Sequence, residues 1–130
     1  MSNPLSLQIP VTQANQTIYA TVESFAAYTQ RITITLPDST TRQFQGSGEF
    51  VQLGTFTFRT TAAGFYTFTV KVEYQSSPGG PWQLSADVVS ASQVVNTLNY
   101  TVVFSEDATD DDDNDSFITF RWFYTGGGPR

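Results

Sequence analysis

The chain has 130 residues, no cysteine, no histidine and a formal net charge of −6. This length predicts one domain with a buried core, which we place at residues 1–125, followed by a glycine-rich extension at 126–130. The absence of cysteine excludes a disulfide framework and a thiol nucleophile, and nucleic-acid binding is disfavoured because there is no basic stripe to meet phosphates.

The first residues have neither the basic start nor the apolar run of a signal peptide, and no segment approaches a membrane-spanning helix. We therefore expect a soluble protein that is cytoplasmic by default. Export by a non-classical route, or association with a cell surface, stays open.

Short runs of alternating apolar and polar residues, separated by turn signals, predict an all-β protein. In the clearest run, 66–74, every second residue is aromatic or valine and shares one face of a strand. About nine short strands predict an antiparallel β-sandwich with Greek-key connections. Ten segments, of which the fourth and fifth are the weakest, are candidates for these strands. In chain order they are residues 5–9, 17–22, 31–36, 41–45, 49–53, 55–59, 66–74, 82–89, 98–104 and 117–122.

Seven of the twelve acidic residues lie in one segment, 105–115, between the last two expected strands. Two carboxylates about 4 Å apart repel by ~1 kcal/mol in water and roughly 4 kcal/mol at an effective dielectric of about 20. The flanking strands contain one positive residue, Arg121. The segment therefore either extends into solvent or binds a cation, and charge alone leaves both possibilities open.

The donors of this acidic segment are all hard oxygens, which favours calcium over zinc or copper. Asp110, Asp112 and Asn114 alternate like the first three ligand positions of an EF-hand loop. An EF-hand is rejected because Asp115 stands where it needs glycine, Arg121 where it needs glutamate, and the flanks are strands. A calcium-binding turn remains, with enough carboxylates for two ions.

Residues 98–115 read LNYTVVFSEDATDDDDND and resemble, without a gap, the calcium-loop signature of the two-calcium bacterial lectins that bind fucose and mannose. The shared pattern is S-E-D-x-T-D-x-D-x-N-D, preceded by Leu-Asn-aromatic and followed seven residues later by Trp122. Both the acidic ligands and the spacers between them fall in register. The resemblance implies a β-sandwich with two Ca²⁺ ions per site.

The resemblance also implies a role for each acidic residue. Sugar hydroxyls would replace calcium-bound waters and hydrogen-bond to the surrounding carboxylates. Asp107 would contact the sugar without binding calcium, while Asp111 and Asp113 occupy spacer positions. The residues implied to bind calcium, the last four of them also contacting the sugar, are Glu106, Asp110, Asp112, Asn114 and Asp115.

A second part of the site is implied by aligning Thr21 and Thr29-Gln30 with the family, which places an expected loop at Phe25-Ala26-Ala27-Tyr28. The main-chain carbonyl of Phe25 would bind calcium, and Ala26, Ala27 and Tyr28 would contact the sugar. In the family a hydroxyl at the first of these three positions accompanies fucose and an alanine accompanies mannose, so mannose is implied. Tyr28 replaces a small residue and would either contact a second sugar or narrow the site.

The end of the chain departs from the family. Family members end on a glycine whose carboxylate reaches the calcium site of a partner subunit. The equivalent position here is about Thr125, and residues 126–130 continue beyond it. The extension would displace that carboxylate or supply a backbone carbonyl instead. The resemblance implies a homodimer, with higher assembly open.

These features predict a calcium-dependent lectin that prefers mannose-type sugars to fucose and is not an enzyme. No histidine or cysteine is available, no base is visible for a serine or threonine nucleophile, and the acidic residues would be occupied as calcium ligands. The alternative is a structural or adhesin β-sandwich without a monosaccharide site, which calcium would stabilise and sugars would not.

Overall fold

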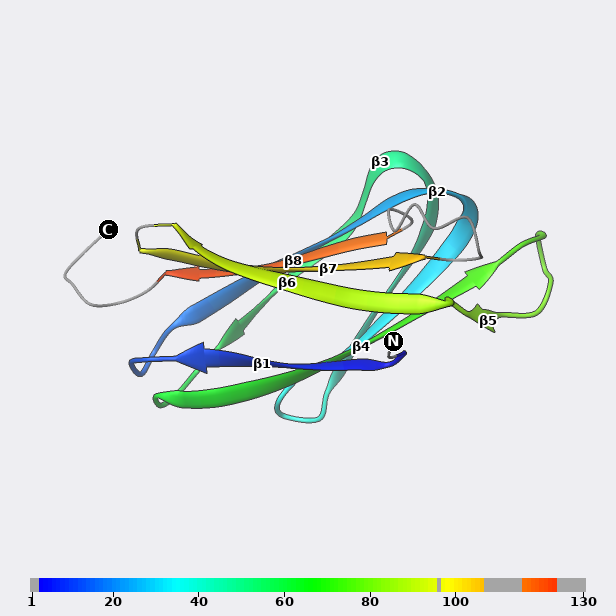
Figure 1. Ribbon diagram of the computed structural model, residues 1–130. Helices are drawn as coiled ribbons and strands as arrows, with labels where there is room; N and C mark the ends of the chain where they lie inside the picture. The colour runs from blue at the N-terminus through cyan, green and yellow to red at the C-terminus, as the bar shows by residue number, and fades with distance from the viewer. Residues whose placement is uncertain (1–2, 96, 107–115, 124–130) are drawn as a thin grey trace.

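The computed structural model describes residues 3–95, 97–106 and 116–123, and every regular element in them is a β-strand (Figure 1). All the strand pairs are antiparallel, which confirms the all-β prediction. No helix long and apolar enough to cross a membrane occurs in these ranges. The strands are β1 (Leu5–Val11), β2 (Thr17–Thr35), β3 (Thr41–Arg59), β4 (Gly64–Gln75), β5 (Gln83–Leu84), β6 (Asp87–Val95), β7 (Leu98–Glu106) and β8 (Ser116–Phe123).

The two layers of the fold are built around β2. It pairs with β3 over nearly its whole length. Along its other edge, residues 19–24 pair with β8 and residues 29–35 pair with β4. From β8 the sheet continues to β7 and β6, and from β4 it continues to β1. Because the two branches leave different halves of β2, they diverge into the upper and lower layers seen in Figure 1.

The hydrophobic core lies between these layers. Phe68 of β4 and Phe120 of β8 are fully buried, and their ring centroids lie 5.1 Å apart across the interior. Val70 and Val72 are also fully buried, which confirms the inward face predicted for 66–74. Trp122 is 4% exposed and belongs to the core.

Three predicted breaks do not end strands. β2 runs through the expected loop at Phe25–Tyr28, and β3 runs through residues 46–48 and residue 54. The described strands number eight rather than about nine. The β2–β3 pair absorbs the irregular residues as register shifts. Gly48 has a φ of 111° and Phe50 one of 58°. The glycine supplies the left-handed conformation that such a shift needs without a steric cost.

Two other boundaries were also wrong. β1 continues through Pro10 to Val11, because in the described structure β1 pairs only with β4 and the missing N–H lies in an edge strand. The expected strand at 82–89 is two strands separated at Ser85. The Ser85 N–H donates to the Val72 carbonyl at 3.0 Å, which turns the chain from β5 toward β6.

Asp38 closes the turn between β2 and β3. Its Oδ1 accepts bonds from the Thr40 hydroxyl at 2.6 Å and from the Thr40 N–H at 3.0 Å. These bonds, the hydroxyl bond first, hold the pKa of Asp38 below its ordinary value because they stabilise the carboxylate.

We expect Thr40→Val to raise the pKa of Asp38, because the stronger of the two bonds is lost. The folded pKa lies below the unfolded one, so the turn's contribution to stability is present above the unfolded pKa and is lost as pH falls through the folded pKa. An NMR titration of the Asp38 carboxyl would measure the shift, with Thr41→Val as a neighbouring control. An unchanged pKa in Thr40→Val would contradict the assignment.

Candidate functional site

The acidic segment lies almost wholly outside the described residues. The structure gives its two ends, where β7 ends at Glu106 and β8 begins at Ser116. The main chain of Glu106 and residues 25–28 are the predicted site positions that it describes. The positions outside it are Asp107, Asp110, Asp111, Asp112, Asp113, Asn114, Asp115, Thr125 and 126–130.

A row of three buried serines joins the ends of the acidic segment to β2. Ser105 of β7 pairs with Ser116 of β8, and Ser116 also pairs with Ser24 of β2. All three have no exposed surface. The base of the acidic segment is therefore fixed beside the point where β2 loses its β8 neighbour.

Phe25 directly follows Ser24, so the structure brings the second predicted part of the site beside the base of the first. This stretch is a bulged part of β2 rather than the expected loop. Ala26 faces Gly48 and Gln30 faces Gly46, so three residues of β2 oppose one residue of β3. Because β8 pairs only up to Ser24 and β4 only from Thr29, no described strand covers the second edge of residues 25–28.

Gln30 links this bulge to the base of the acidic segment. It is fully buried, and its Oε1 accepts a bond from the Ser116 hydroxyl at 2.8 Å. Its Nε2 donates to the Tyr28 carbonyl at 3.3 Å. A buried amide bonded at both ends fixes the groups that it joins. The sequence signal for this role is a glutamine at an inward position of a strand whose neighbouring inward residue is Ile32.

Asp87 is a second residue that the sequence did not single out. It pairs with Glu106 across β6 and β7, which adds an eighth acidic residue beside the segment. Its Oδ1 is buried and, like Ser105 Oγ, has no hydrogen-bond partner among the described residues. Buried polar atoms are rarely left unpaired, so these two oxygens mark this corner of the sheet as one that a cation would suit.

Four phenylalanines from four strands pack on the opposite face of the sheet from the serine row. The Phe25 ring lies 4.8 Å from the rings of Phe50 and Phe117, and Phe117 lies 6.0 Å from Phe104. These contacts join β2, β3, β7 and β8 around the base of the acidic segment. They also engage the Phe25 side chain in packing, which leaves its main chain for any role in the site.

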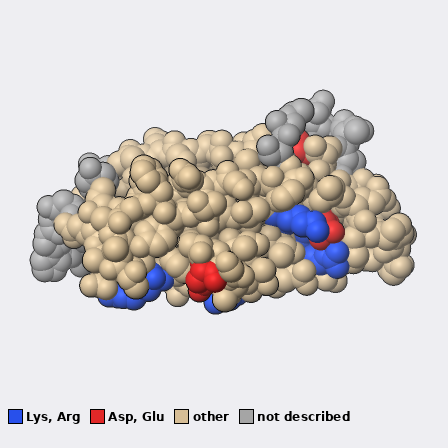
Figure 2. Space-filling view, turned by 90° about the horizontal axis from the view of Figure 1, so that it is seen from below, with Lys and Arg blue, Asp and Glu red and all other residues tan. Residues whose placement is uncertain are grey.

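Charge outside the acidic segment is sparse. On the face shown in Figure 2, Lys and Arg side chains lie close to Asp and Glu within a largely uncharged surface. Glu73 binds Arg31 at 3.0 and 3.1 Å and lies 3.7 Å from Lys71. Outside the acidic segment, the described surface thus offers few carboxylates that would compete for a cation.

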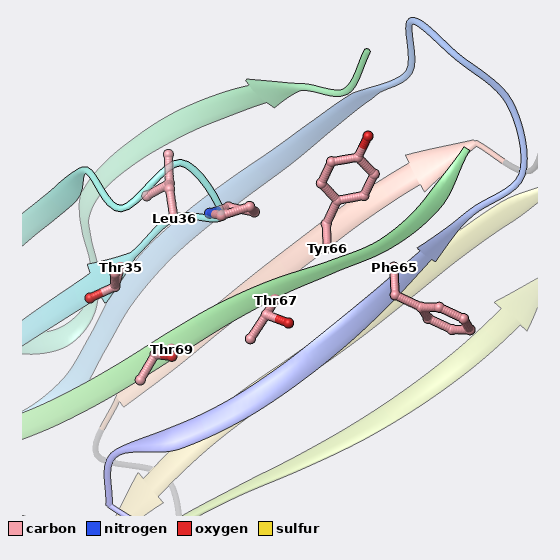
Figure 3. A pocket seen from close by; sticks show the side chains of 7 residues that line it. Thr35, Leu36, Phe65, Tyr66, Thr67 and Thr69 are labelled. Atoms are coloured by element: carbon pink, nitrogen blue, oxygen red, sulfur yellow. The ribbon is translucent and has the colours of Figure 1, made fainter. Parts of the chain in front are cut away.

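A hollow of about 490 Å³ lies at the far end of β4 from Tyr74 (Figure 3). Phe65, Thr67 and Thr69 project from β4 here, and its lining contains no charged side chain. The Tyr66 hydroxyl beside it donates to the Ala62 carbonyl at 2.6 Å. Compared with the serine row and its acidic neighbours, this hollow lacks the groups that would bind a cation.

The sequence profile of the family described as Fucose-binding lectin II (PA-IIL) matches residues 7–124, nearly the whole chain. The chain belongs to this family. The match confirms the resemblance to the fucose- and mannose-binding bacterial lectins. PA-IIL proteins bind carbohydrates and are not enzymes, which confirms the prediction that this chain is not an enzyme. A comparison with curated protein sequences gave no significant match.

Solved structures of bacterial lectins resemble this PA-IIL chain over most of its length. The high-affinity mannose-binding lectin of Ralstonia solanacearum is 31% identical, with 90% of this chain and 94% of that chain covered and a TM-score of 0.64. The lectin CV2L of Chromobacterium violaceum, solved in complex with alpha-methyl-fucoside, is 31% identical, with 94% and 97% covered and a TM-score of 0.66. The C-terminal domain of the Burkholderia cenocepacia lectin BC2L-C is 21% identical, with 94% and 97% covered and a TM-score of 0.62, and supports the fold alone.

Proposed function

We propose that this PA-IIL chain binds sugars through a pair of calcium ions held by its acidic segment, and that it prefers mannose-type sugars to fucose. Carbohydrate binding follows from the family, while the calcium dependence and the preference are the proposal. The observation that carries it is the serine row, because it sets the uncovered edge of residues 25–28 beside the base of the acidic segment.

The donor set fits calcium. Seven carboxylates lie in one segment, and Asp87 adds another opposite Glu106. Calcium takes about 6–8 oxygen ligands and, when bound here, would offer positions that neighbouring sugar hydroxyls can fill. Asp107 would accept a charge-assisted hydrogen bond from a sugar hydroxyl. The residues proposed to hold the two ions are Glu106, Asp110, Asp112, Asn114, Asp115 and, through its carbonyl, Phe25.

The preference for mannose-type sugars depends on Ala26 and Ala27. Ala26 is buried and Ala27 is exposed, and neither carries a hydroxyl that could bond a sugar. The two bacterial lectins that are 31% identical are described with mannose in one case and a fucoside in the other, so identity alone does not favour either sugar. The homodimer expected from the resemblance is part of the proposal.

Calorimetric titration of methyl mannoside and methyl fucoside into the calcium-loaded protein tests the proposal. We expect heat with both sugars, tighter binding of the mannoside, and no heat after chelation of calcium. Heat that persists in chelator would contradict the calcium-dependent mechanism, and tighter fucoside binding would contradict the preference.

The alternative of a calcium-stabilised structural domain is tested by thermal unfolding. Both readings predict that calcium raises the melting temperature, but only a lectin predicts a further rise on addition of a monosaccharide. A large rise in melting temperature with calcium, and no further rise with either sugar, would favour the structural domain.

A further inference from the structure

We infer that Tyr28 and Tyr74 form a second saccharide subsite, which receives the sugar residue next to the one bound at the calcium site. This subsite rests on the proposed function, because it extends that site along a glycan. Its ligand class is an oligosaccharide of neutral pyranose sugars.

The two tyrosines form one aromatic surface. Their ring centroids lie 5.6 Å apart and their planes differ by 13°, so the rings are stacked. Tyr28 remains 39% exposed in spite of this contact, and Tyr74 is half-buried. The pair lies where β2 passes from one layer to the other, because Tyr28 belongs to the bulge and Tyr74 pairs with Gln30 just after it.

Both tyrosines are held in place from the protein side. The Tyr28 carbonyl accepts a bond from the buried Gln30, and the Tyr74 hydroxyl donates to Gln83 Oε1 of β5 at 3.1 Å. Next to them Arg31 binds Glu73 with two hydrogen bonds. A surface fixed before binding loses little conformational entropy when a ligand arrives.

The Arg31 guanidinium also lies 4.2 Å from the centre of the Trp82 ring. This contact ties the segment before β5 to β2, and β5 in turn pairs with Tyr74. The end of β4 that carries Tyr74 is therefore anchored on both sides.

The position of the pair fits the next sugar of a glycan. Tyr28 is two residues beyond Ala26, and two residues of extended chain span at most about 7 Å, which is of the order of one pyranose ring. Gln30 binds both Tyr28 and Ser116, so this spacing from the base of the acidic segment is fixed.

The chemistry of tyrosine also fits. A pyranose has a face of C–H groups and a rim of hydroxyls, and tyrosine presents an apolar ring face with a polar hydroxyl at its edge. Phe50 and Phe65 are more exposed, at 80% and 72%, but carry no such hydroxyl. Tyr19 has a hydroxyl and is 47% exposed, but it pairs with Arg121, at the other end of the β2–β8 pairing from Ser24. The tyrosine pair therefore combines the chemistry that suits a sugar with a position beside residues 25–28.

The test compares a methylated monosaccharide with the disaccharide that extends it by one residue, both titrated into calcium-loaded protein. We expect the wild-type protein to bind the disaccharide about threefold to tenfold more tightly. Tyr28→Ala and Tyr74→Ala should each bring this ratio close to one, and Tyr74→Ala should leave the monosaccharide affinity nearly unchanged.

Tyr100→Ala is the matched control, because Tyr100 also donates its hydroxyl to a cross-strand glutamine, Gln93, at 2.9 Å. It should keep the wild-type ratio. A ratio near one in wild type, or an unchanged ratio in Tyr28→Ala, would overturn the subsite while the proposed function stands. Tyr28→Ala alone decides the matter if Tyr74→Ala does not fold, since the Tyr28 side chain is 39% exposed. A wild-type protein that bound neither sugar would overturn the proposed function and the subsite with it.

Discussion

Replacing Asp112 by alanine is expected to abolish calcium binding and sugar binding together. The resemblance to the two-calcium lectins also implies that Asp112 bridges the two ions, so its loss would remove a ligand from each of them. We expect the affinity for methyl mannoside to fall by about 100-fold or more. Calorimetric titrations of calcium and of methyl mannoside would measure the two losses separately.

Asp111→Ala and Asp113→Ala are the controls for this prediction. Each removes the same charge from the same acidic segment, but at a spacer position. At such positions the carboxylates are expected to act on calcium only through solvent, where salt screens the attraction, so affinity should change by no more than about threefold. Sugar binding retained by Asp112→Ala, or lost equally in Asp111→Ala, would contradict the ligand assignment.

Replacing Phe68 by alanine is expected to destabilise the fold by ~3–5 kcal/mol, because truncation of a fully buried aromatic side chain leaves a cavity. Phe68 contacts Phe120 of the opposite layer at 5.1 Å and Phe58 of β3 at 5.7 Å. Truncation of Phe68 therefore removes packing between the two layers as well as packing against β3. Urea unfolding in the presence of chelator would measure the free energy of unfolding without a contribution from bound calcium.

Phe65→Ala removes the same side chain three residues earlier in β4, where it is 72% exposed. We expect a change of no more than about 0.5 kcal/mol. Equal destabilisation by the two substitutions would show that the interior between the layers is not the main source of stability.

The alternation of residues predicted the fold class but not the length of the strands. In 66–74 the fully buried Phe68, Val70 and Val72 share one face, and that alternation is visible without knowledge of any partner strand. In contrast, the continuity of β2 and β3 depends on their pairing with each other, since each covers the irregular residues of the other. Local signals such as Gly-Ser-Gly at 46–48 therefore predicted strand ends at positions where the paired strands continue through bulges.

The part of the candidate site that could be predicted consists of residues close together in the sequence. The acidic segment is visible in the sequence because its seven carboxylates all lie within residues 106–115. Asp87 and Gln30 could not be assigned to the site in this way. Each lies near it because of a strand pairing, Asp87 with Glu106 and Gln30 with Tyr74, and such registers are set only when the sheet forms. The stretch at 25–28 was assigned to the site from the sequence. Its bulged strand conformation, however, depends on its pairing with β3 and on where the β8 and β4 pairings end.

The division of β2 between two branches also has a consequence for the order of folding. The β2–β3 and β6–β7 hairpins join neighbouring segments, whereas the pairing of Tyr19 with Arg121 joins residues from near opposite ends of the chain. Contacts of such long sequence separation form slowly, because much of the chain must be ordered first. The serine row needs this pairing, so the base of the site is among the last parts to assemble, and during synthesis it must wait for β8. A cation bound there would slow the unfolding of a finished molecule rather than guide the formation of its first hairpins.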